Sequence, residues 1–411
     1  MEEVVVTSYS LVTSIGSTIE EFSSKMFAGD SGVVSIRDSM VHSSFPVPYA
    51  AMVPRDTLYQ SNYFKGKENE FLLKSWLMTA LAVERALAEV PNTTPIDSII
   101  YGTADGVSFE LVTHFLKSGV HGDKFIPLVT RSESSLIIFN EVMKSMGFAG
   151  VPEKELISIN SACATGNQTL GVALQKIRSG QSQRCLVGGV DSRCEPSNFL
   201  NFFLLGAVTT EDVSPAMASK PFAKNRSGFV RGEGAAVLLL ESKKAALARG
   251  AKILGKVVGY GNTSDAFRLT DGRDDGLCVI EAMRSAIKSA NIEPEQIDYI
   301  NAHGTSTPLN DRLETFAIKK LFGEKAYQIP VSSLKSQIGH ATIASSAIEA
   351  VACLLMLEKQ IIAPTINYEI PDPECDLDYV PNVKRSHNMK YVLSNAFGFG
   401  GQNACIVFEK V

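Results

Sequence analysis

The chain has 411 residues, of which 45% are hydrophobic, and a formal net charge of −5. This is enough apolar material for one large or two medium-sized hydrophobic cores. The acidic balance excludes a globally basic surface of the kind that binds nucleic acid. A local basic patch that docks an acidic protein partner stays compatible with it.

The first residues, MEEVVVTSYS, begin with acids and lack the basic segment and cleavage site of a secretory signal. The longest apolar runs, such as residues 235–240, fall far short of the roughly 20 residues that a membrane span needs. Seven cysteines are an odd number without CxxC pairs, which favours reduced thiols over disulfides. We therefore predict a soluble cytoplasmic protein that binds neither membrane nor nucleic acid.

In the first half of the chain, apolar residues recur at helical spacing between residues 73 and 81. A strand is expected within PIDSIIYGTADG (95–106). The segment LISINSACATGNQTLGVALQKI (156–177) predicts a strand, a tight turn and a helix. RCLVGGVDS (184–192) predicts a central strand that ends in a turn.

The second half repeats this series. A helix with a buried face is expected between residues 279 and 287, and a strand within QIDYINAHGTST (296–307). Strand, turn and helix follow in residues 329–357, and a strand in residues 390–401. The two series are offset by roughly 200 residues, which indicates an internal duplication.

Buried strands that alternate with helices predict an α/β fold. We expect a duplicated α/β/α/β/α sandwich with an N-terminal half of residues 1–250 and a C-terminal half of residues 251–411. The first half is longer, chiefly because of an insertion at about residues 107–155. Two copies whose strands end at a common cleft would bring Cys163, His303, Lys335 and His340 together.

Cys163 is a candidate nucleophile because it stands at a strand-to-helix turn among Ser161, Ala162, Ala164 and Gly166. Amides at a helix start stabilise a thiolate, so we expect a lowered thiol pKa. Small neighbours would let a substrate carbonyl approach. The other cysteines in apolar runs are interpreted as buried structural residues.

His303 and His340 stand at expected strand ends, flanked by Gly304 and Gly339. Two neutral imidazoles that each present an Nε2–H would clamp an oxyanion or enolate. A single such histidine is more often a hydrogen-bonded core residue. A zinc site of one cysteine and two histidines lacks short ligand spacing, so no metal is predicted.

Lys335 and Glu349 complete the candidate set. A lysine in so apolar a stretch needs a partner, and Glu349 is expected on the next helix. The lysine charge would hold the nearby imidazoles neutral. The alternative is a solvated ion pair. In NAFGFGGQN, the glycines around Phe399 lack phosphate-loop spacing; we favour a turn that supplies an oxyanion-hole N–H.

Six blocks resemble the β-ketoacyl-acyl-carrier-protein synthases of the Cys-His-His class, and the likeness covers nearly the whole chain. They are ACATG, PFAKNRSGFVRGEGA, INAHGTSTPLND, VSSLKSQIGH, PDPECDLDYVP and SNAFGFGG. The resemblance implies a thiolase fold, which is a five-layer sandwich, and a dimer. It also implies a decarboxylative Claisen condensation, in which Cys163 takes an acyl chain and His303 and His340 support loss of CO₂ from malonyl-carrier protein.

The same resemblance implies an oxyanion hole formed by the backbone N–H groups of Cys163 and Phe399, with Phe399 as a gate. Thr305 and Thr307 would contact the pantetheine arm. No soluble cofactor is implied, because the phosphopantetheine arrives on the acyl carrier protein.

Neighbouring classes fit less well. Degradative thiolases need a second cysteine in a Cys-x-Gly turn, where this chain has Phe-Gly-Phe-Gly. Inactive chain-length factors lack the nucleophile, and a dehydrogenase would need a glycine fingerprint. The chain departs from its own family at Ala223, where Asp is usual, and at Ile343, Ser345 and Ser346, where the family has a Gly-Ala-rich helix start. Residues 103–146 also differ.

NDRLET, AYQIPVSSLKS and PDPECDLDYVP resemble the catalytic ketosynthase subunits of type II polyketide synthases. We therefore expect a ketosynthase of a polyketide or specialised fatty-acid pathway. The alternative is a housekeeping β-ketoacyl synthase II. The partner would be a second copy or a chain-length-factor-like subunit. Candidate carrier-docking residues are Lys65, Lys67, Lys124 and Arg131.

Overall fold

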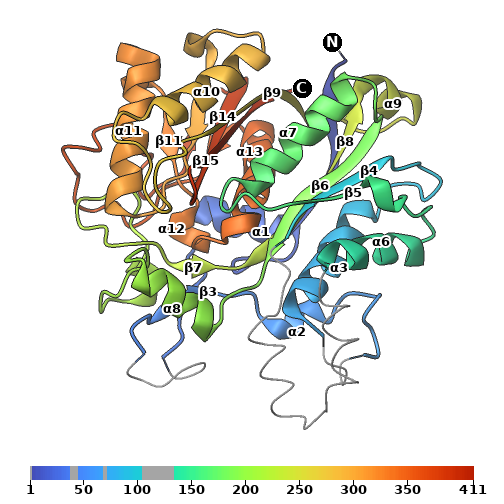
Figure 1. Cartoon of the computed structure of the whole chain (residues 1–411), viewed down its shortest axis with the longest axis horizontal. Helices are drawn as coiled ribbons and strands as arrows, with labels where there is room; N and C mark the ends of the chain where they lie inside the picture. Colours follow the sequence, from blue (N-terminus) through green and yellow to red (C-terminus); the bar gives the residue numbers. More distant parts are fainter. Residues whose placement is uncertain (1, 38–44, 68–71, 104–133) are drawn as a thin grey trace.

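The structure is a computed structural model of the chain, and it describes residues 2–37, 45–67, 72–103 and 134–411. Its main feature is one sheet of ten strands (Figure 1). In chain order these strands are β1 (Val4–Thr13), β4 (Ser98–Gly102), β5 (Leu156–Ile159), β6 (Arg184–Asp191), β8 (Gly234–Ser242), β9 (Gly255–Ser264), β10 (Tyr299–Asn301), β11 (Val331–Ser332), β14 (Tyr391–Gly398) and β15 (Gln402–Glu409).

The sheet consists of two halves with the same strand order, β5-β4-β6-β8-β1 and β11-β10-β14-β15-β9. In the first half β4 is parallel to β5 and β6, while β8 is antiparallel to β6 and β1. In the second half β10 is parallel to β11 and β14, while β15 is antiparallel to β14 and β9. The duplication predicted from the sequence is confirmed, since the segments 95–106 and 296–307 hold the equivalent strands β4 and β10.

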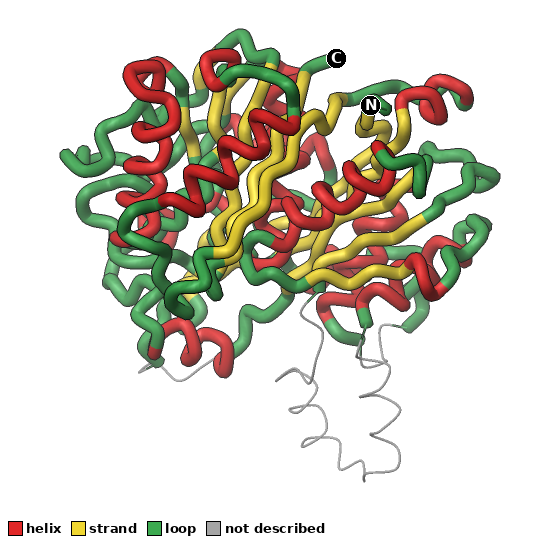
Figure 2. Tube along the Cα trace, turned by 45° about the horizontal axis from the view of Figure 1, so that its top comes forward, coloured by secondary structure: helices red, strands yellow, loops and turns green. Residues whose placement is uncertain are grey.

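The two halves of the sheet meet where β1 pairs with β9. This antiparallel pairing covers only two positions, Val5 with Lys256 and Val6 with Gly255. Because so few residues join the halves, the rest of each half is free to lie on its own side of a central helical layer, as Figure 2 shows.

Two helices, α7 (Thr165–Arg178) and α13 (Ser345–Lys359), form that central layer. They contact each other, and each contacts strands of both halves. α3 (Lys74–Leu87) and α6 (Ser135–Ser145) cover the outer face of the first half. α10 (Leu277–Ser289) and α11 (Pro308–Phe322) cover that of the second. The predicted five-layer α/β/α/β/α sandwich of the thiolase fold is therefore confirmed.

Alternation along β8 explains how one strand serves two cores. Val237 and Leu239 belong to the cluster beneath α3 and α6, whereas Leu238 and Leu240 belong to the cluster around α7 and α13. Side chains of a strand alternate between the two faces of its sheet. All four residues are 0% exposed, so the continuous apolar run of this strand reflects burial on both faces.

Shorter elements surround the sandwich. Among the described helices, none is long and apolar enough to span a bilayer. Of the predicted insertion, only residues 134–155 lie within the described part. The division of the chain at residue 250 stays a prediction. The remaining elements are α1 (Ile19–Ala28), α2 (Arg55–Leu58), α8 (Pro196–Leu204), α9 (Lys243–Ala248), α12 (Lys335–Ile338), β2 (Val33–Ser35), β3 (Tyr49–Ala51), β7 (Arg231–Gly232), β12 (Ile361–Ile362) and β13 (Arg385–Ser386).

Candidate active site

Cys163 lies on the tight turn that joins β5 to α7. Ala162, the residue before it, has a left-handed φ of 49°, a conformation that is strained for a residue with a Cβ. The backbone N–H of Ala164 donates to the Ser161 carbonyl at 3.1 Å. The Thr165 hydroxyl donates to the Ala162 carbonyl at 2.7 Å. The turn buries the thiol, because Cys163 is only 5% exposed.

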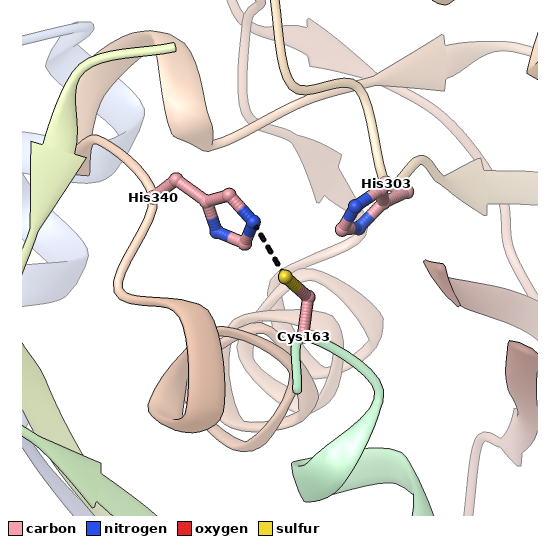
Figure 3. A group of neighbouring side chains, drawn as sticks. All are labelled: Cys163, His303 and His340. Atoms are coloured by element: carbon pink, nitrogen blue, oxygen red, sulfur yellow. Dashed lines mark hydrogen bonds between the residues drawn. The ribbon is translucent and has the colours of Figure 1, made fainter. Parts of the chain in front are cut away.

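The two predicted histidines converge on this thiol from the other half of the chain (Figure 3). The Cys163 sulfur lies 3.1 Å from Nε2 of His340. The rings of His340 and His303 have centroids 5.3 Å apart and an interplanar angle of 80°. Both histidines are almost fully buried. The convergence of Cys163, His303 and His340 that the duplication predicted is therefore observed.

Both imidazoles are held in the neutral form. Burial and the positive charge of Lys335 hold the pKa of His303 well below its ordinary value. Burial, Lys335 and Arg231 do the same to the pKa of His340. A neutral imidazole carries a single N–H, so each ring has one donor and one acceptor nitrogen.

Lys335 is the first residue of α12 and is buried beside the histidines. Its Nζ lies 2.5 Å from Oε1 of Glu349 on α13, and each side chain is 1% exposed. The predicted partnership is present in the structure, and the alternative of a solvated pair is wrong because both groups are out of contact with water.

A second buried ion pair fixes the segment that carries His340. Arg231, in β7, is 2.6 Å from Asp191 at the end of β6, and both side chains are 0% exposed. The same guanidinium donates to the His340 carbonyl at 3.0 Å and to the Thr342 hydroxyl at 2.9 Å. Burial works to raise the pKa of Asp191, but Arg231 and Arg193 outweigh it and hold that pKa below its ordinary value. No motif in the sequence predicts this network.

A buried carboxyl holds the loop that carries His303. Glu314, on α11, accepts the backbone N–H of His303 at 2.9 Å and that of Gly304 at 2.8 Å. It also accepts the Asn395 side-chain amide at 3.0 Å. Burial nevertheless raises the pKa of Glu314 to about 7. Sequence reasoning assigned no role to this residue, although NDRLET was among the notable segments.

The turn after β14 approaches Cys163 closely. A Cβ on Gly398 would lie 2.8 Å from the Ser161 carbonyl oxygen and 3.0 Å from the Cys163 nitrogen, so only glycine fits there. The backbone N–H of Phe399 is within hydrogen-bonding reach of the Cys163 sulfur. The two amides predicted for the oxyanion hole, those of Cys163 and Phe399, therefore lie next to each other.

The pKa of the Cys163 thiol differs from the one predicted from the sequence. Burial raises the pKa of Cys163 to about 11, and the opposing effects of Lys335 and the Phe399 amide do not offset it. The lowered pKa predicted from the helix start is wrong for this buried setting. The resting cysteine is therefore a neutral thiol at physiological pH.

A cavity of about 900 Å³ leads from the surface to this thiol. Its buried end is lined by Cys163, His303 and His340, and its outer part by residues such as Phe267 and Leu309, which are 50% and 52% exposed. Thr305 and Thr307 also line it, with hydroxyls 2.8 Å apart. Both threonines therefore lie in the cavity that leads to the Cys163 sulfur.

The departures from the family lie close to the site. The Ser345 hydroxyl is 2.9 Å from Nδ1 of His340. The Ser346 hydroxyl donates to the Cys163 carbonyl at 3.3 Å and accepts the Asn167 N–H at 3.1 Å.

Ile343 is buried against Gly102 and Gly189, at the ends of β4 and β6. Ala223 is fully buried, and its carbonyl accepts from Arg226 at 2.9 Å.

The candidate docking residues are only partly visible. Lys65 is exposed, and the Lys67 ammonium lies 5.0 Å from the centre of the Tyr63 ring. Neither lysine lines the cavity. Lys124 and Arg131 lie outside the described residues.

Within the described residues, one group has the chemistry to hold a metal ion. The ligand atoms of Cys163, His303 and His340 lie within 4.8 Å of one another. The absence of a metal, which the wide spacing of these residues in the sequence predicts, stays a prediction.

Two family descriptions match the chain. "Beta-ketoacyl synthase, N-terminal domain" matches residues 1–246, and "Beta-ketoacyl synthase, C-terminal domain" matches residues 254–369. The match to the N-terminal domain alone covers more than half of the chain.

Curated relatives carry two kinds of name. A 3-oxoacyl-[acyl-carrier-protein] synthase 2 of Vibrio harveyi is 33% identical over 99% of this chain and 98% of its own length. A protein of the same name from Synechocystis is 45% identical over 61% of this chain and 60% of its own length. The chain thus spans less than two thirds of that relative. The tetracenomycin polyketide synthase ketoacyl synthase alpha subunit of Streptomyces glaucescens is 38% identical over 77% of this chain and 72% of its own length.

Solved structures of ketosynthases are also similar to this chain. One is a type II polyketide ketosynthase bound to a hexaketide, in complex with its acyl carrier protein. It has a TM-score of 0.87 and 32% sequence identity, and the match covers 100% of both chains. The ishigamide ketosynthase/chain length factor has a TM-score of 0.86 and 32% identity, with 100% of this chain and 99% of that one covered. With its buried cysteine, two converging histidines and matches along both halves, the chain belongs to the β-ketoacyl synthase family.

Proposed function

We propose that this protein is a ketosynthase that condenses malonyl-carrier protein with an acyl chain held on Cys163. The observation that carries the proposal is the convergence of one thiol and two neutral imidazoles at the closed end of a cavity. We assign the pathway to type II polyketide or specialised fatty-acid synthesis. The alternative, a housekeeping synthase II, has support from relatives that carry that name.

The first half-reaction is a thioester exchange. The Cys163 sulfur attacks the acyl thioester of the carrier, the carrier thiol leaves, and the proton of Cys163 passes to it. The backbone N–H groups of Cys163 and Phe399 stabilise the tetrahedral oxyanion. The Phe399 ring acts as the gate, and Thr305 and Thr307 hold the pantetheine arm. No soluble cofactor takes part.

The second half-reaction forms the carbon–carbon bond. The malonyl group loses CO₂, and the electron pair that is left behind attacks the Cys163 thioester. The sulfur of Cys163 leaves and takes up a proton from solvent, and the β-ketoacyl chain stays on the carrier. His303 and His340 donate hydrogen bonds to the enolate oxygen, while burial and the charge of Lys335, the ion-pair partner of Glu349, keep both rings uncharged.

The test separates the two half-reactions. Acyl-carrier protein should add acyl mass to the wild type and none to Cys163→Ala. His303→Ala and His340→Ala should keep some acylation but lose condensation on the order of 10²-fold or more. An unchanged acyl load on Cys163→Ala, or near-normal condensation by His303→Ala, would refute the assignment.

The partners follow from the same proposal. β5 is an edge strand that pairs only with β4 among the described strands, and its Ile157 and Ile159 are half-buried. An edge strand with half-buried apolar side chains favours pairing with a second subunit. We propose a dimer with a second copy or a chain-length-factor-like subunit, for which the ishigamide pair is a precedent. Co-expression with a Cys-lacking paralogue should give a 1:1 complex; a fully active homodimer that ignores it would favour the housekeeping alternative.

We propose that the acyl carrier protein docks on a surface that includes Lys65, Lys67, Lys124 and Arg131. Charge reversal of Lys65 and Lys67 together should raise KM for carrier-bound substrate at low salt and have less effect at high salt. Substrates on a pantetheine fragment without the carrier are the matched control, since their kinetics should not change. Unaltered carrier kinetics would remove these two residues from the docking surface.

A further inference from the structure

The hydroxyl of Ser345 contacts the reactive histidine. Its oxygen lies 2.9 Å from Nδ1 of His340, on the side of the ring opposite to Cys163. Both residues are buried, at 1% and 2% exposure, so water does not compete for this contact. Within the described part of the chain, the Ser345 hydroxyl has no other hydrogen-bond partner. Among the described residues, the imidazole of His340 is therefore the one side chain that this hydroxyl contacts by a hydrogen bond.

The local fold explains why this hydroxyl reaches the ring. His340 and Ser345 are separated by the short 3₁₀ turn Thr342–Ala344, and Ser345 opens α13. Arg231 holds the backbone of His340 by a hydrogen bond to its carbonyl. The next hydroxyl, that of Ser346, contacts the Cys163 and Asn167 backbone and does not contact the ring. The two serines thus contact different parts of the site: Ser345 the His340 ring, and Ser346 the backbone around Cys163.

We propose that Ser345 is a positioning residue that sets the tautomer of His340. A hydroxyl that donates to Nδ1 leaves that nitrogen without a proton, so the single N–H of the neutral ring must be at Nε2. Nε2 is the nitrogen that faces the Cys163 sulfur. The hydrogen bond thereby directs a donor to the position where the enolate oxygen forms. This inference rests on the proposed condensation, which needs that donor.

The expected kinetic effect is specific to one step. Ser345→Ala removes the donor to Nδ1 and lets the ring adopt the other tautomer, in which Nε2 is an acceptor. Condensation should fall about 10-fold, the scale of one lost hydrogen bond. Acylation of Cys163 should change less than about 2-fold, because thioester exchange does not use the Nε2–H. Ser345→Thr keeps the hydroxyl and should restore condensation.

The decisive measurement is the nitrogen NMR spectrum of the histidine ring. Wild-type protein with ¹⁵N-labelled histidine, with the signals assigned through His340→Gln, should show His340 protonated at Nε2 and bare at Nδ1. Ser345→Ala should lose that pattern, and Ser346→Ala should keep it. A proton at Nδ1 in the wild type would overturn the proposal, even if Ser345→Ala failed to fold.

The two readouts separate this proposal from the proposed function. A wild-type protein with no condensing activity would refute the function, whereas the ring spectrum would still report on the tautomer. Equal losses of acylation and condensation in Ser345→Ala, with an unchanged spectrum, would reduce Ser345 to a packing residue and overturn the inference.

Discussion

Lys335 and Glu349 form a buried ion pair in which Nζ lies 2.5 Å from Oε1, next to two imidazoles that carry no partner charge. Burial lowers the pKa of both His303 and His340, and the lysine charge lowers both pKa values further. The glutamate limits the cost of burying that charge, because an unpaired ion in the interior is strongly unfavourable. One pair therefore links the stability of the fold to the protonation state of the site.

Replacing Lys335 by Ala should destabilise the protein by about 3–5 kcal/mol, because Glu349 would remain buried without a cation. The pKa values of both histidines should rise, so the rings would become protonated at higher pH than in the wild type. The low-pH limb of the condensation profile should therefore move to higher pH. Chemical denaturation and a kcat profile between pH 5 and 8 measure the two effects.

The double variant Lys335→Ala, Glu349→Gln is the control for this experiment. It should recover part of the lost stability but none of the pH shift, since the lysine charge is still missing. A low-pH limb that stays at its wild-type position in both variants would contradict the role given to Lys335.

The raised pKa of Cys163 predicts its reactivity. With a thiol pKa of about 11, the thiolate is a minor species at neutral pH, and only the thiolate reacts with iodoacetamide. The alkylation rate of the Cys163 peptide, followed by mass spectrometry, should rise about tenfold per pH unit from pH 7 to 10. Circular dichroism over the same range checks that the fold persists. A rate that levels off below pH 8 would instead indicate the low pKa first expected from the helix start.

Glu314 should give the stability of the protein a pH dependence. Its pKa is raised to about 7 in the folded state, from an ordinary value of 4.5. Between these values the folded state keeps a proton that the unfolded state has released, so this contribution to stability is lost as the pH rises from 4.5 to 7. Its size is roughly 3 kcal/mol.

The matched variant for that measurement is Glu314→Gln, which cannot titrate. The difference in unfolding free energy between wild type and Glu314→Gln should change by that amount between pH 4.5 and pH 8, in the sense that the wild type loses more. The low pKa values of the two histidines act in the opposite direction, but they are common to both proteins and cancel. A difference that stays constant with pH would show that Glu314 is not a buried titrating group.

Gly398 should tolerate no side chain. A Cβ there would lie 2.8 Å from the Ser161 carbonyl oxygen and 3.0 Å from the Cys163 nitrogen. Gly398→Ala should displace the turn and disturb both amides that we propose for the oxyanion hole, with a loss on the order of 10²-fold in acylation and in condensation. Gly400→Asn is the control, since nothing lies within 4 Å of that position and Asn tolerates its left-handed φ. Equal activity in both variants would refute the close approach.

The repeated pattern of strands and helices was enough to predict the duplicated sandwich and the meeting of Cys163 with His303 and His340. This worked because periodicity is local, and two copies of one unit place equivalent strand ends at one cleft. Lys335 and Glu349 were also paired correctly, since a buried lysine must find a carboxylate. The contact of Ser345 with the ring was not predicted, although the residue was noted as a departure.

The remaining features depend on contacts between segments far apart in the chain. Asp191 and Arg231 meet through two different strands, and no local pattern marks either as a partner of the other. The pKa of Cys163 was predicted in the wrong direction because helix amides can be recognised in a sequence, whereas the degree of burial cannot. Burial was the larger effect at this position.

The left-handed backbone of Ala162 has a consequence for engineering the protein. A strained residue persists only where its surroundings determine its conformation. Glycine adopts this conformation without a steric penalty but gives the unfolded chain more freedom. Ala162 therefore accepts backbone strain, and in return the turn before Cys163 is stiffer than it would be with glycine. Ala162→Gly would therefore relieve the backbone strain and at the same time loosen the turn that holds the neighbouring sulfur.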